Sequence, residues 1–523
     1  MSSKRVAASA ATSRLALTTR ASSGVVLLTR ASNHSALRRV TARGSVDGVT
    51  PTVDPDAQAY DVVVIGAGPA GTAAALHARR LGATVAVVEA SRVGGTCVNT
   101  GCVPTRVLAK AARLVRDARG AGAHGIEVEG VSVDWSRVVS RVHARVDAVR
   151  AVKREGQRFA EAGVDLFTEG RARFADPHVV VLDSGRQLRA GSTVLAVGGR
   201  SRRLPVPGAE LALVPEEVLH QPSLPPRVAV IGAGNTGAQL VTVFSAFGSA
   251  VTLLDLAPRV LSFADHDVSA RISAAFTAQG VRVLTGIQGV ERLERASSGA
   301  VVLHWLDERG AASSDEFDAV VMATGWPAAL DGLDLEAAGV RFERNRVPVD
   351  EHYRTNVPHV LAVGDVIGTD MLVQAAQFEG ETAAANAVLG AQARRPHELL
   401  PSGGFTDPDY AGVGLTEEQA RKRAPGCRVA TVGYDALDRA VIDDRSGGFL
   451  KLVVDSGRTS ILGAHAVGES AVEVIQAMTT AMAAGVELAT LAQVRFAYPT
   501  YSAVIGLAAR LALSQESDAA ELH

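Results

Sequence analysis

The sequence has few cysteines, no long apolar run and almost no net charge. Only three of its 523 residues are cysteine, which argues against a secreted scaffold held by disulfides and fits a reducing compartment such as the cytoplasm. No apolar run reaches the roughly 18 residues that a membrane-spanning helix needs. A net charge of −2 offers no basic surface for nucleic acid. We therefore expect a globular protein that binds neither membranes nor nucleic acids.

Acidic residues are absent from the first 46 positions, which carry eight Lys or Arg and leave a net charge of −10 for the remainder. Residues 1–57 are rich in Ser, Ala, Thr and Arg, a composition typical of organelle transit peptides. A disordered leader, or a start codon assigned too far upstream, would have the same composition. We expect a leader of one of these kinds, and a transit peptide would make the protein mitochondrial.

The remaining chain is too long for one hydrophobic core, so several domains are expected. Its 51 glycines and 47% apolar content suit α/β domains with tight turns between strands and helices. Helical patterns are expected from 106 to 120 and from about 135 to 161, followed by short apolar strands up to about 196. The Pro-rich stretch 221–226 is typical of a linker.

Two cysteines, Cys97 and Cys102, lie in the stretch GGTCVNTGCVPTR, residues 94–106. On a regular helix, residues five positions apart are separated by about 7.5 Å along the axis and about 140° around it, which is too far for a disulfide. The sulfurs can meet only where the backbone bends, and we expect Asn99 and Gly101 to bend it by adopting positive φ. A helix starting there would lower the pKa of a thiol at its positive end. We predict a redox-active disulfide; two inert cysteines, or half of a zinc site, are the alternatives.

A nucleotide-binding pattern begins at Tyr60, where a buried-strand run leads into Gly66-x-Gly68-x-x-Gly71, a helical pattern and a second strand ending at Glu89. In this pattern the glycines allow a tight turn, close approach of a pyrophosphate to a helix N-terminus, and close packing of helix on strand. An acid at the end of the second strand can accept hydrogen bonds from ribose hydroxyls. The pattern therefore predicts a dinucleotide site.

A second copy of the pattern has Gly232, Gly234 and Gly237 between a strand and a helix, and Asp255 ends the next strand. We expect this unit to bind the nicotinamide nucleotide; the alternative is a vestigial unit that only supports the fold. Asp255 favours the ribose diol of NADH over a 2′-phosphate. Arg259 nearby keeps NADPH as an alternative.

These motifs, in this order, resemble those of the class I pyridine nucleotide–disulfide oxidoreductases, a family that includes dihydrolipoamide dehydrogenase, glutathione reductase and mercuric reductase. The resemblance extends from about Tyr60 to about Leu513. It implies an α/β fold with two Rossmann-type nucleotide-binding domains, a C-terminal α+β dimerisation domain and a homodimer. The implied segments are 58–205 and 324–398 for the FAD domain, 206–323 for the NAD(P) domain, and 399–523 for the interface domain.

The resemblance also implies FAD in the first unit, with Cys102 in contact with the flavin, Cys97 facing the substrate, and Asp365 bonded to the ribityl chain. The candidate cofactor-binding residues are Gly66, Gly68, Pro69, Ala70, Gly71, Glu89, Gly95, Thr96, Gly232, Gly234, Asn235, Gly237, Asp255, Gly325, Gly364 and Asp365. The candidate catalytic residues are Cys97, Cys102, Arg106 and Tyr498.

The chain departs from the family pattern near the flavin. The lysine usually found four positions after the second cysteine is Arg106, and the glutamate that pairs with it is Gln239. A buried charge that has lost its ion-pair partner destabilises the fold, so a change at one of these positions is expected to accompany a change at the other. Asn235 replaces the tyrosine that often gates the nicotinamide pocket.

A larger departure lies near the C-terminus. Members that handle dithiols carry HPTxSE, whose histidine, oriented by the glutamate, shuttles the proton for the first cysteine of the partner subunit. Here residues 498–503 read YPTYSA, so the resemblance places Tyr498 of one subunit opposite Cys97 of the other. A tyrosine, with an ordinary pKa near 10, is protonated at neutral pH and is therefore a poor general base. Loss of a general base lowers the reaction rate by roughly 10²–10⁴-fold. Mercuric reductases also carry tyrosine at this position, although the extra cysteine pair and metal-binding domain usual in that enzyme are not found in this sequence.

We therefore predict an FAD-dependent NAD(P)H oxidoreductase that passes electrons through Cys97 and Cys102 to a small disulfide or a soft metal ion. The alternatives are a dithiol oxidase, a quinone reductase, and a non-catalytic FAD-binding redox sensor. No resident metal is expected. Cys427 is expected to be a non-functional thiol at a strand start, and the cluster Asp265-His266-Asp267 a solvated helix start.

Overall fold

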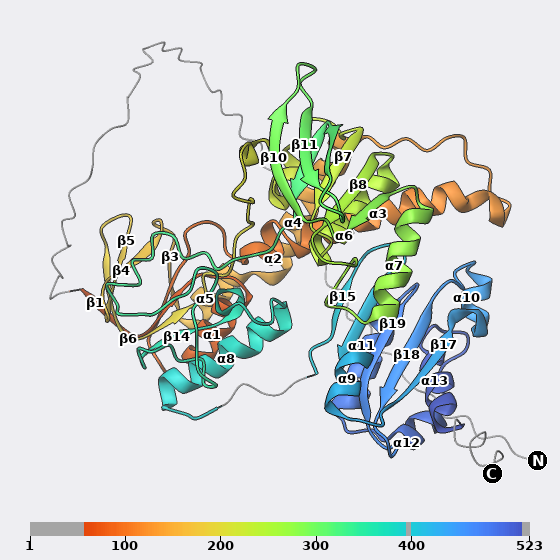
Figure 1. The fold of residues 1–523 in the computed structure, drawn as a ribbon. Coiled ribbons are helices and arrows are strands. Elements are labelled where there is room, and N and C mark those ends of the chain that lie inside the picture. The colour runs from red at the N-terminus through yellow and green to blue at the C-terminus, as the bar shows by residue number, and fades with distance from the viewer. Residues whose placement is uncertain (1–56, 394–398, 515–523) are drawn as a thin grey trace, which may run out of the picture. The chain divides into compact units, whose positions relative to one another are not determined.

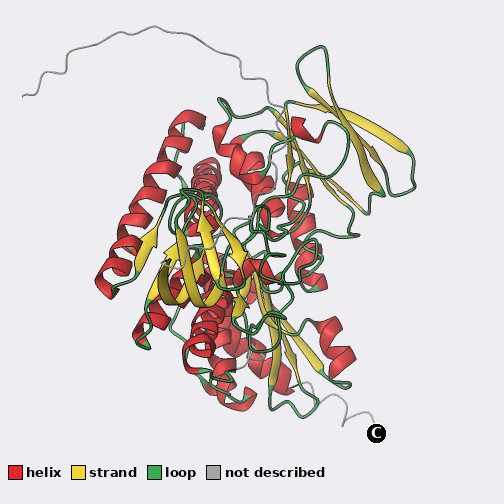
Figure 2. Ribbon diagram, turned by 90° about the vertical axis from the view of Figure 1, so that its left-hand side faces the viewer, coloured by secondary structure: helices red, strands yellow, loops and turns green. Residues whose placement is uncertain are grey.

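The computed structural model describes residues 57–393 and 399–514. The leader expected at 1–57 lies outside these residues, except for Ala57. The described chain is a mixed α/β protein with four β-sheets (Figure 1). Figure 2 shows their strands in yellow with helices in red packed around them. Within the described residues, no helix is both long enough and apolar enough to cross a membrane.

The first sheet contains seven strands in the order β3-β2-β1-β6-β5-β4, with β14 also paired to β6. Its strands are β1 (Gln58–Ile65), β2 (Val85–Val88), β3 (Asp165–Phe167), β4 (Ala172–Asp176), β5 (Val179–Leu182), β6 (Gln187–Leu195) and β14 (Val360–Ala362). Residues 62–65 of β1 are buried, as expected for a parallel strand covered on both faces. Because β14 pairs in parallel with β6, a late segment of the chain completes the sheet that the early segment begins.

Two helices from these two segments pack side by side on this sheet: α1 (Pro69–Arg80) and α8 (Val373–Leu389) (Figure 1). Their backbones meet at Gly380, where a Cβ atom would lie 2.2 Å from the carbonyl oxygen of Ala70. The short helix η4 (Gly364–Ile367) lies between β14 and α8. The contact therefore brings the first glycine motif next to the Gly364–Asp365 pair.

Four helices follow β2: α2 (Gly95–Asn99), α3 (Cys102–Gly120), α4 (Trp135–Lys153) and α5 (Glu155–Ala162), with the short η1 (Ala121–His124) after α3. The expectation of one helix from about 135 to 161 is wrong. Arg154 adopts a left-handed conformation, with φ 49°, and separates α4 from α5. The break turns the two residues that flank it, Lys153 and Glu155, toward each other.

The second nucleotide-binding unit has a parallel sheet in the order β13-β7-β8-β9. Its strands are β7 (Arg227–Ile231), β8 (Ala250–Asp255), β9 (Arg282–Thr285) and β13 (Ala319–Met322), with helices α6 (Asn235–Phe247) and α7 (His266–Ala278) and the short helices η2 (Ala209–Leu211) and η3 (Pro215–His220) before it. An antiparallel sheet of β10 (Gly289–Arg295), β11 (Val301–Leu306) and β12 (Ala312–Phe317) packs against it through a core that includes Trp305 and Phe317. The order of parallel strands is that expected of a Rossmann-type unit.

The C-terminal region has a five-stranded antiparallel sheet in the order β15-β16-β19-β18-β17. Its strands are β15 (Ser402–Gly404), β16 (Tyr410–Gly414), β17 (Arg428–Gly433), β18 (Phe449–Val454) and β19 (Ile461–Val467). Its helices are α9 (Glu417–Arg423), η5 (Tyr434–Ala436), α10 (Asp438–Ile442), α11 (Ala471–Ala483), α12 (Leu488–Gln493) and α13 (Ala503–Ser514). Cys427 is buried next to the start of β17, as expected.

The cluster Asp265-His266-Asp267, expected to be a solvated helix start, lies where α7 meets the C-terminal region. Asp265 caps α7, so a helix does start there. However, Asp265 is only 1% exposed and accepts a hydrogen bond of 2.9 Å from the ammonium of Lys451 on β18. Lys451 also pairs with Asp267 and Glu417. The expected helix start is therefore present, and His266 and Asp267 are exposed as expected, but Asp265 is buried in an ion pair between the second unit and the C-terminal region.

Candidate active site

The first glycine motif forms the turn from β1 into α1. Gly66 has φ 103°, and a Cβ atom there would lie 2.4 Å from the carbonyl oxygen of Ala196 on the neighbouring chain segment. A Cβ atom at Gly71 would lie 1.9 Å from the Gly66 carbonyl oxygen. Gly68 is the N-cap and provides no side-chain cap, and Pro69 begins the helix. The first-turn N–H groups of α1 are thus left for an outside acceptor such as a phosphate.

The second motif repeats this turn from β7 into α6. Gly232 has φ 106° and approaches the Ala323 carbonyl oxygen, and a Cβ atom at Gly237 would lie 1.8 Å from the Gly232 carbonyl oxygen. Gly234 is the N-cap, again with no side-chain cap. Gly325, with φ 106°, lies exposed after β13 and accepts a hydrogen bond of 3.3 Å from the Arg202 N–H.

The acid that follows each motif is held in the same way. Glu89 accepts hydrogen bonds of 2.8 Å from the N–H groups of Ala67 and Ser91. Asp255 accepts one from the Ala233 N–H and one of 2.6 Å from the Ala257 N–H. Each carboxylate is therefore fixed at the edge of its glycine turn. A carboxylate oxygen can accept more than one hydrogen bond, so both acids can also accept from ribose hydroxyls.

The two cysteines lie on consecutive helices, Cys97 in α2 and Cys102 at the start of α3. The chain bends between them because the N–H groups of Thr100 and Gly101 both donate to the Thr96 carbonyl oxygen, at 3.0 and 2.7 Å. The expectation of positive φ at Asn99 and Gly101 is wrong: Gly101 has φ −112° and Asn99 ends α2. Gly101 is suited to this place because a Cβ atom would lie 3.1 Å from the Thr96 carbonyl oxygen.

Both cysteines are free thiols in hydrogen-bond contact. The hydrogen bond from the Cys97 thiol lowers the pKa of Cys102, which is exposed to solvent, to about 7. The same hydrogen bond, together with burial, raises the pKa of Cys97 well above its ordinary value. The dithiol therefore loses its first proton at Cys102, while Cys97 keeps its own.

A cavity of about 840 Å³ joins the two cysteines to both nucleotide-binding units. The predicted site residues that line it are Gly66, Gly68, Pro69, Ala70, Glu89, Gly95, Thr96, Cys97, Cys102, Asn235, Gly364 and Asp365. The predicted residues that do not line it are Gly71, Arg106, Gly232, Gly234, Gly237, Asp255, Gly325 and Tyr498. The structure thus brings the residues predicted for FAD together around the cysteines, and Asn235 of the second unit joins them.

The lining of this cavity fits FAD. The uncapped end of α1 and the Glu89 carboxylate supply partners for a pyrophosphate and a ribose. At the other end, burial raises the pKa of Asp365, which lines the cavity. The backbone N–H of Gly364 donates a 2.7 Å hydrogen bond to Glu379, a carboxylate that is only 2% exposed. Glu379 was not identified from the sequence, although a glutamate in the middle of an Ala-rich helix was a signal for it.

Arg106 and Gln239 do not form a substitute ion pair. The Arg106 guanidinium carbon lies 3.6 Å from the centre of the Phe405 ring, and burial lowers the pKa of Arg106. The Gln239 amide oxygen accepts a 3.3 Å hydrogen bond from the Phe405 N–H, and its nitrogen donates to Asn235 at 2.9 Å. Phe405, a cavity-lining residue that sequence reasoning missed, therefore stands between the two positions where the family has lysine and glutamate.

Tyr498 lies away from the cavity on the surface of the C-terminal region, with 79% of the residue exposed. Its hydroxyl donates a 2.7 Å hydrogen bond to the Asp438 carboxylate on α10. This hydrogen bond raises the pKa of Tyr498. Asp438 was not identified from the sequence, because it lies 60 positions away and belongs to no motif.

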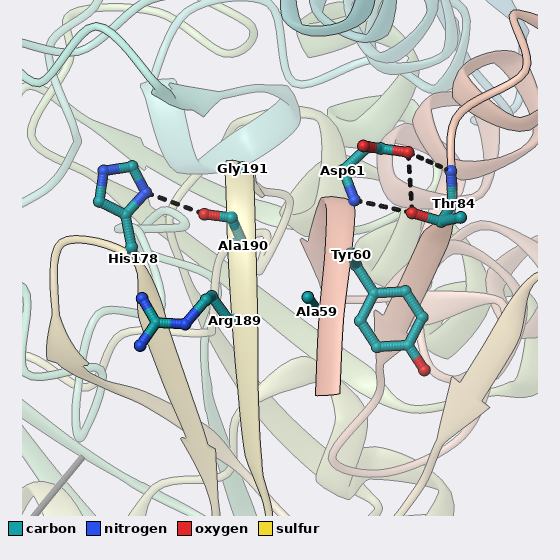
Figure 3. Close-up of a pocket in the computed structure, with 8 residues that line it drawn as sticks. All are labelled: Ala59, Tyr60, Asp61, Thr84, His178, Arg189, Ala190 and Gly191. Carbon is teal, nitrogen blue, oxygen red and sulfur yellow. Dashed lines mark hydrogen bonds between the residues drawn. The ribbon is translucent and has the colours of Figure 1, made fainter. Parts of the chain in front are cut away.

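A second, smaller cavity of about 320 Å³ lies at β1, β2 and β6 and contains no predicted site residue (Figure 3). The side chains of Tyr60, Asp61 and His178 in its lining already have hydrogen-bond partners. Asp61 accepts from the Thr84 N–H at 2.7 Å, and the His178 ring lies 2.9 Å from the Ala190 carbonyl oxygen. Tyr60 donates to Asp165 at 2.7 Å. The described residues also contain no group of three or more His, Cys, Asp or Glu side chains placed to hold a metal ion. The larger cavity is therefore the candidate active site.

Comparisons with known proteins agree with this site. Residues 60–380 match the family model described as pyridine nucleotide-disulphide oxidoreductase, and residues 400–509 match the dimerisation domain of the same family. Mercuric reductase of Bacillus cereus is 32% identical over 452 residues, covering 86% of this chain and 71% of the relative. Dihydrolipoyl dehydrogenase of Zymomonas mobilis is 30% identical over 451 residues, covering 85% of this chain and 96% of the relative.

Among solved structures, the HOCl-induced flavoprotein disulfide reductase RclA from Escherichia coli has a TM-score of 0.76 and 26% identity, covering 86% of this chain and all of that one. A Cu(II) complex of the same enzyme has a TM-score of 0.77. The chain therefore belongs to the class I pyridine nucleotide–disulfide oxidoreductases, a family that depends on FAD and NAD(P)H. The match to the dimerisation domain supports a homodimer.

Proposed function

We propose that this protein is a NADH-dependent flavoprotein that passes an electron pair through Cys97 and Cys102 to a soft metal ion or a small disulfide. One observation carries the proposal: both thiols, the residues suited to FAD, and Asn235 of the second unit line a single cavity. A hydride donor, the flavin and the dithiol can thus meet in one space. FAD, when bound, accepts a hydride from the nicotinamide and delivers the electron pair to the Cys97–Cys102 disulfide.

The roles of the two cysteines follow the family pattern, and the hydrogen bond between the two thiols supports them. Cys102 is the first to become a thiolate, and in the proposal it lies against the flavin. Cys97 is the thiol that meets the acceptor. With a disulfide acceptor, the Cys97 thiolate attacks one sulfur and displaces the other as a thiolate. Cys102 then attacks Cys97, which releases the second thiolate and re-forms the Cys97–Cys102 disulfide.

A soft metal ion fits the site better than a disulfide substrate does. The Tyr498 hydroxyl donates a hydrogen bond to Asp438, which raises the pKa of this tyrosine and makes it a poorer proton-accepting base at neutral pH. A soft metal ion requires two thiolates as ligands and no proton transfer to a leaving group. Mercuric reductases are among the relatives, and the solved structure of RclA was also determined with Cu(II).

Arg106 takes part indirectly in this proposal. The Arg106 guanidinium stacks on the ring of Phe405, and Phe405 lines the cavity. Arg106 therefore holds a cavity-lining side chain in place but does not line the cavity itself. We also propose that the protein works in a reducing compartment such as the cytoplasm, where NADH is available and isolated thiols persist.

NADH is the preferred donor in this proposal. Asp255 is fixed by two backbone N–H groups at the end of β8, where its charge would repel a 2′-phosphate. Arg259, the cation that could have bound such a phosphate, instead donates to the carbonyl oxygens of Ser262 and Ala264, at 2.9 and 3.3 Å.

The test is NADH consumption by the purified flavoprotein with Hg²⁺, Cu²⁺, a small disulfide, a quinone and oxygen, each offered as the sole acceptor. We expect the fastest turnover with a soft metal ion and at least 10³-fold less in Cys97→Ser, because the variant lacks the attacking thiol. Turnover of the quinone or oxygen that survives in Cys97→Ser would instead identify a quinone reductase or an oxidase. Absence of turnover with every acceptor would favour a redox sensor.

A further inference from the structure

The break between α4 and α5 holds an ion pair next to the helix that carries Cys97. Lys153 ends α4 and Glu155 begins α5, and the left-handed Arg154 between them turns the two side chains together. The ammonium nitrogen of Lys153 lies 3.7 Å from a Glu155 carboxylate oxygen, and their side chains are 34% and 11% exposed. A pair this well covered is screened by water less than an ordinary surface pair.

Two contacts fix this pair against α2. The Arg150 guanidinium, one turn before Lys153, donates hydrogen bonds of 2.8 and 2.6 Å to the side-chain oxygen of Asn99, the last residue of α2. The Glu155 carboxylate lies at the other end of α2, where a Cβ atom on Gly94 would be 3.2 Å from its oxygen. Since Cys97 lies between Gly94 and Asn99, the α4–α5 junction is attached on both sides of this thiol.

The Lys153–Glu155 ion pair and Asp365 are the charged groups that shift the pKa values of the two cysteines. Lys153 lowers the pKa of both Cys97 and Cys102. Two carboxylates oppose it: Glu155 raises the pKa of Cys97, and Asp365 raises that of Cys102. Arg106, the cation expected from the sequence to act here, stacks on Phe405 instead. Around Glu155 itself, Lys153 and Arg158 are the cations that face it.

We propose that Lys153 is the cation that stabilises the Cys97 thiolate when this sulfur attacks its acceptor, and that the Glu155 carboxylate, its ion-pair partner, partly offsets this stabilisation. The inference rests on the proposed function, because it assigns Cys97 the attacking role. Lys153 acts within the same subunit, whereas the missing histidine dyad would have come from the partner. The step is a simple ionisation in which the Cys97 proton passes to water and the negative charge on sulfur is balanced by the ammonium. Lys153 does not line the cavity and is therefore a positioning residue.

The test measures how fast iodoacetamide alkylates Cys97 as a function of pH, in the full flavoprotein carrying Cys102→Ser. In this background the peptide between Arg92 and Arg106 contains Cys97 as its single cysteine, so mass spectrometry reports its alkylation alone. We expect Lys153→Met to slow alkylation at pH 7 by about tenfold and to move the pH profile to higher pH, because one pKa unit is a factor of ten in thiolate. Lys153→Arg, which keeps the charge, should restore most of the rate.

The matched control is Lys110→Met, which removes an exposed lysine from α3 and should leave the profile unchanged. Glu155→Gln should raise the rate, because the carboxylate opposes ionisation of Cys97. A Lys153→Met profile that superimposes on that of the parent, or an equal loss in Lys153→Arg, would overturn the inference. The assay needs neither hydride transfer nor an acceptor. It can therefore fail while NADH still generates a thiolate–flavin absorption band in wild type, which separates failure of this inference from failure of the proposed function.

Discussion

The two nucleotide-binding units share the backbone geometry of the glycine turn but differ in the chain segment that packs against it. In both, a Cβ atom on the last glycine would lie within 2 Å of the carbonyl oxygen of the first, and an acid is held by two backbone N–H groups. In the first unit, however, Gly95 of the cysteine segment packs on Gly68, and a Cβ atom on Gly95 would lie 2.7 Å from the Gly68 Cα. In the second unit, a Cβ atom on Gly234 would meet nothing within 4 Å.

This difference suits two modes of binding. The first site is enclosed by a second chain segment, which fits a cofactor that stays bound through many turnovers. The second site is open at its helix N-terminus, which fits a nucleotide that must enter and leave in each cycle. The cysteine segment thus acts both as the redox centre and as one wall of the first site.

The largest expected effect comes from breaking the enclosed site alone. Gly95 has φ 59° and touches Gly68, so Gly95→Ala combines backbone strain with a clash. We expect the purified Gly95→Ala protein to contain almost no FAD, as measured by flavin absorbance per chain. Gly234→Ala should keep its FAD and raise the KM for NADH by about tenfold or more, because its methyl group blocks the approach of the pyrophosphate. Equal FAD content in the two variants would contradict the comparison.

A second prediction concerns the two acids. Asp255→Ala should raise the KM for NADH by about 10- to 100-fold, because a hydrogen bond to a charged group is worth about 1.5–3 kcal/mol. It should also narrow the preference for NADH over NADPH, measured as the ratio of the two kcat/KM values. Glu89→Ala is the matched change in the first unit and should weaken FAD retention while leaving that ratio unchanged. A similar fall in FAD content in both variants would show that the two sites are not independent.

A third prediction concerns pH. The hydrogen bond from Cys97 lowers the pKa of Cys102 to about 7, so the Cys102 thiolate is present above this pH and is lost as the pH falls through it. The long-wavelength thiolate–flavin absorption of the NADH-reduced protein should therefore fade between about pH 8 and pH 6. In Cys97→Ala, which removes the donor, the midpoint should move to higher pH. An unchanged midpoint would show that the hydrogen bond from Cys97 does not lower the pKa of Cys102.

The smallest expected effect is at Tyr498. The hydrogen bond to Asp438 raises the pKa of Tyr498, so we expect no general-base role, and Tyr498→Phe should lower turnover with a disulfide acceptor by less than about tenfold. Loss of a true general base would cost roughly 10²–10⁴-fold. Asp438→Asn provides the control, since it keeps a hydrogen-bond acceptor while removing the charge. A fall in turnover of more than about 10²-fold in Tyr498→Phe would show that this residue takes part in proton transfer.

Much of this site was predictable because its geometry is local. Glycine turns, the acid that ends each second strand, and the cysteine pair each lie within one strand–turn–helix unit, so spacing alone places them. The bend between the cysteines was predicted, but its cause was not: hydrogen bonds to the Thr96 carbonyl oxygen make it, without positive φ at Asn99 or Gly101. A residue type that tolerates an unusual conformation does not by itself reveal whether that conformation is used.

Contacts between distant segments could not be predicted. The partner of Tyr498 is Asp438, the partner of Arg106 is Phe405, and the charge beside Cys97 comes from a helix break at Arg154 that the periodicity of 135–161 did not show. Asp265 was expected to be solvated because clustered charges usually are. Burying Lys451 against it required a β-strand from a different domain. Except at Arg154, where the local pattern itself was misleading, the missing information in each case was the tertiary partner.

The most direct test of the central claim is an anaerobic titration of the purified protein with NADH, followed by its visible spectrum. We expect Cys102 to become a thiolate against the flavin while Cys97 keeps its proton. We predict that one equivalent of NADH produces a new long-wavelength absorption band, and that this band is absent in Cys102→Ser. Bleaching of the flavin without any such band in the wild-type protein would contradict the account, because the cysteines would then take no part in electron transfer.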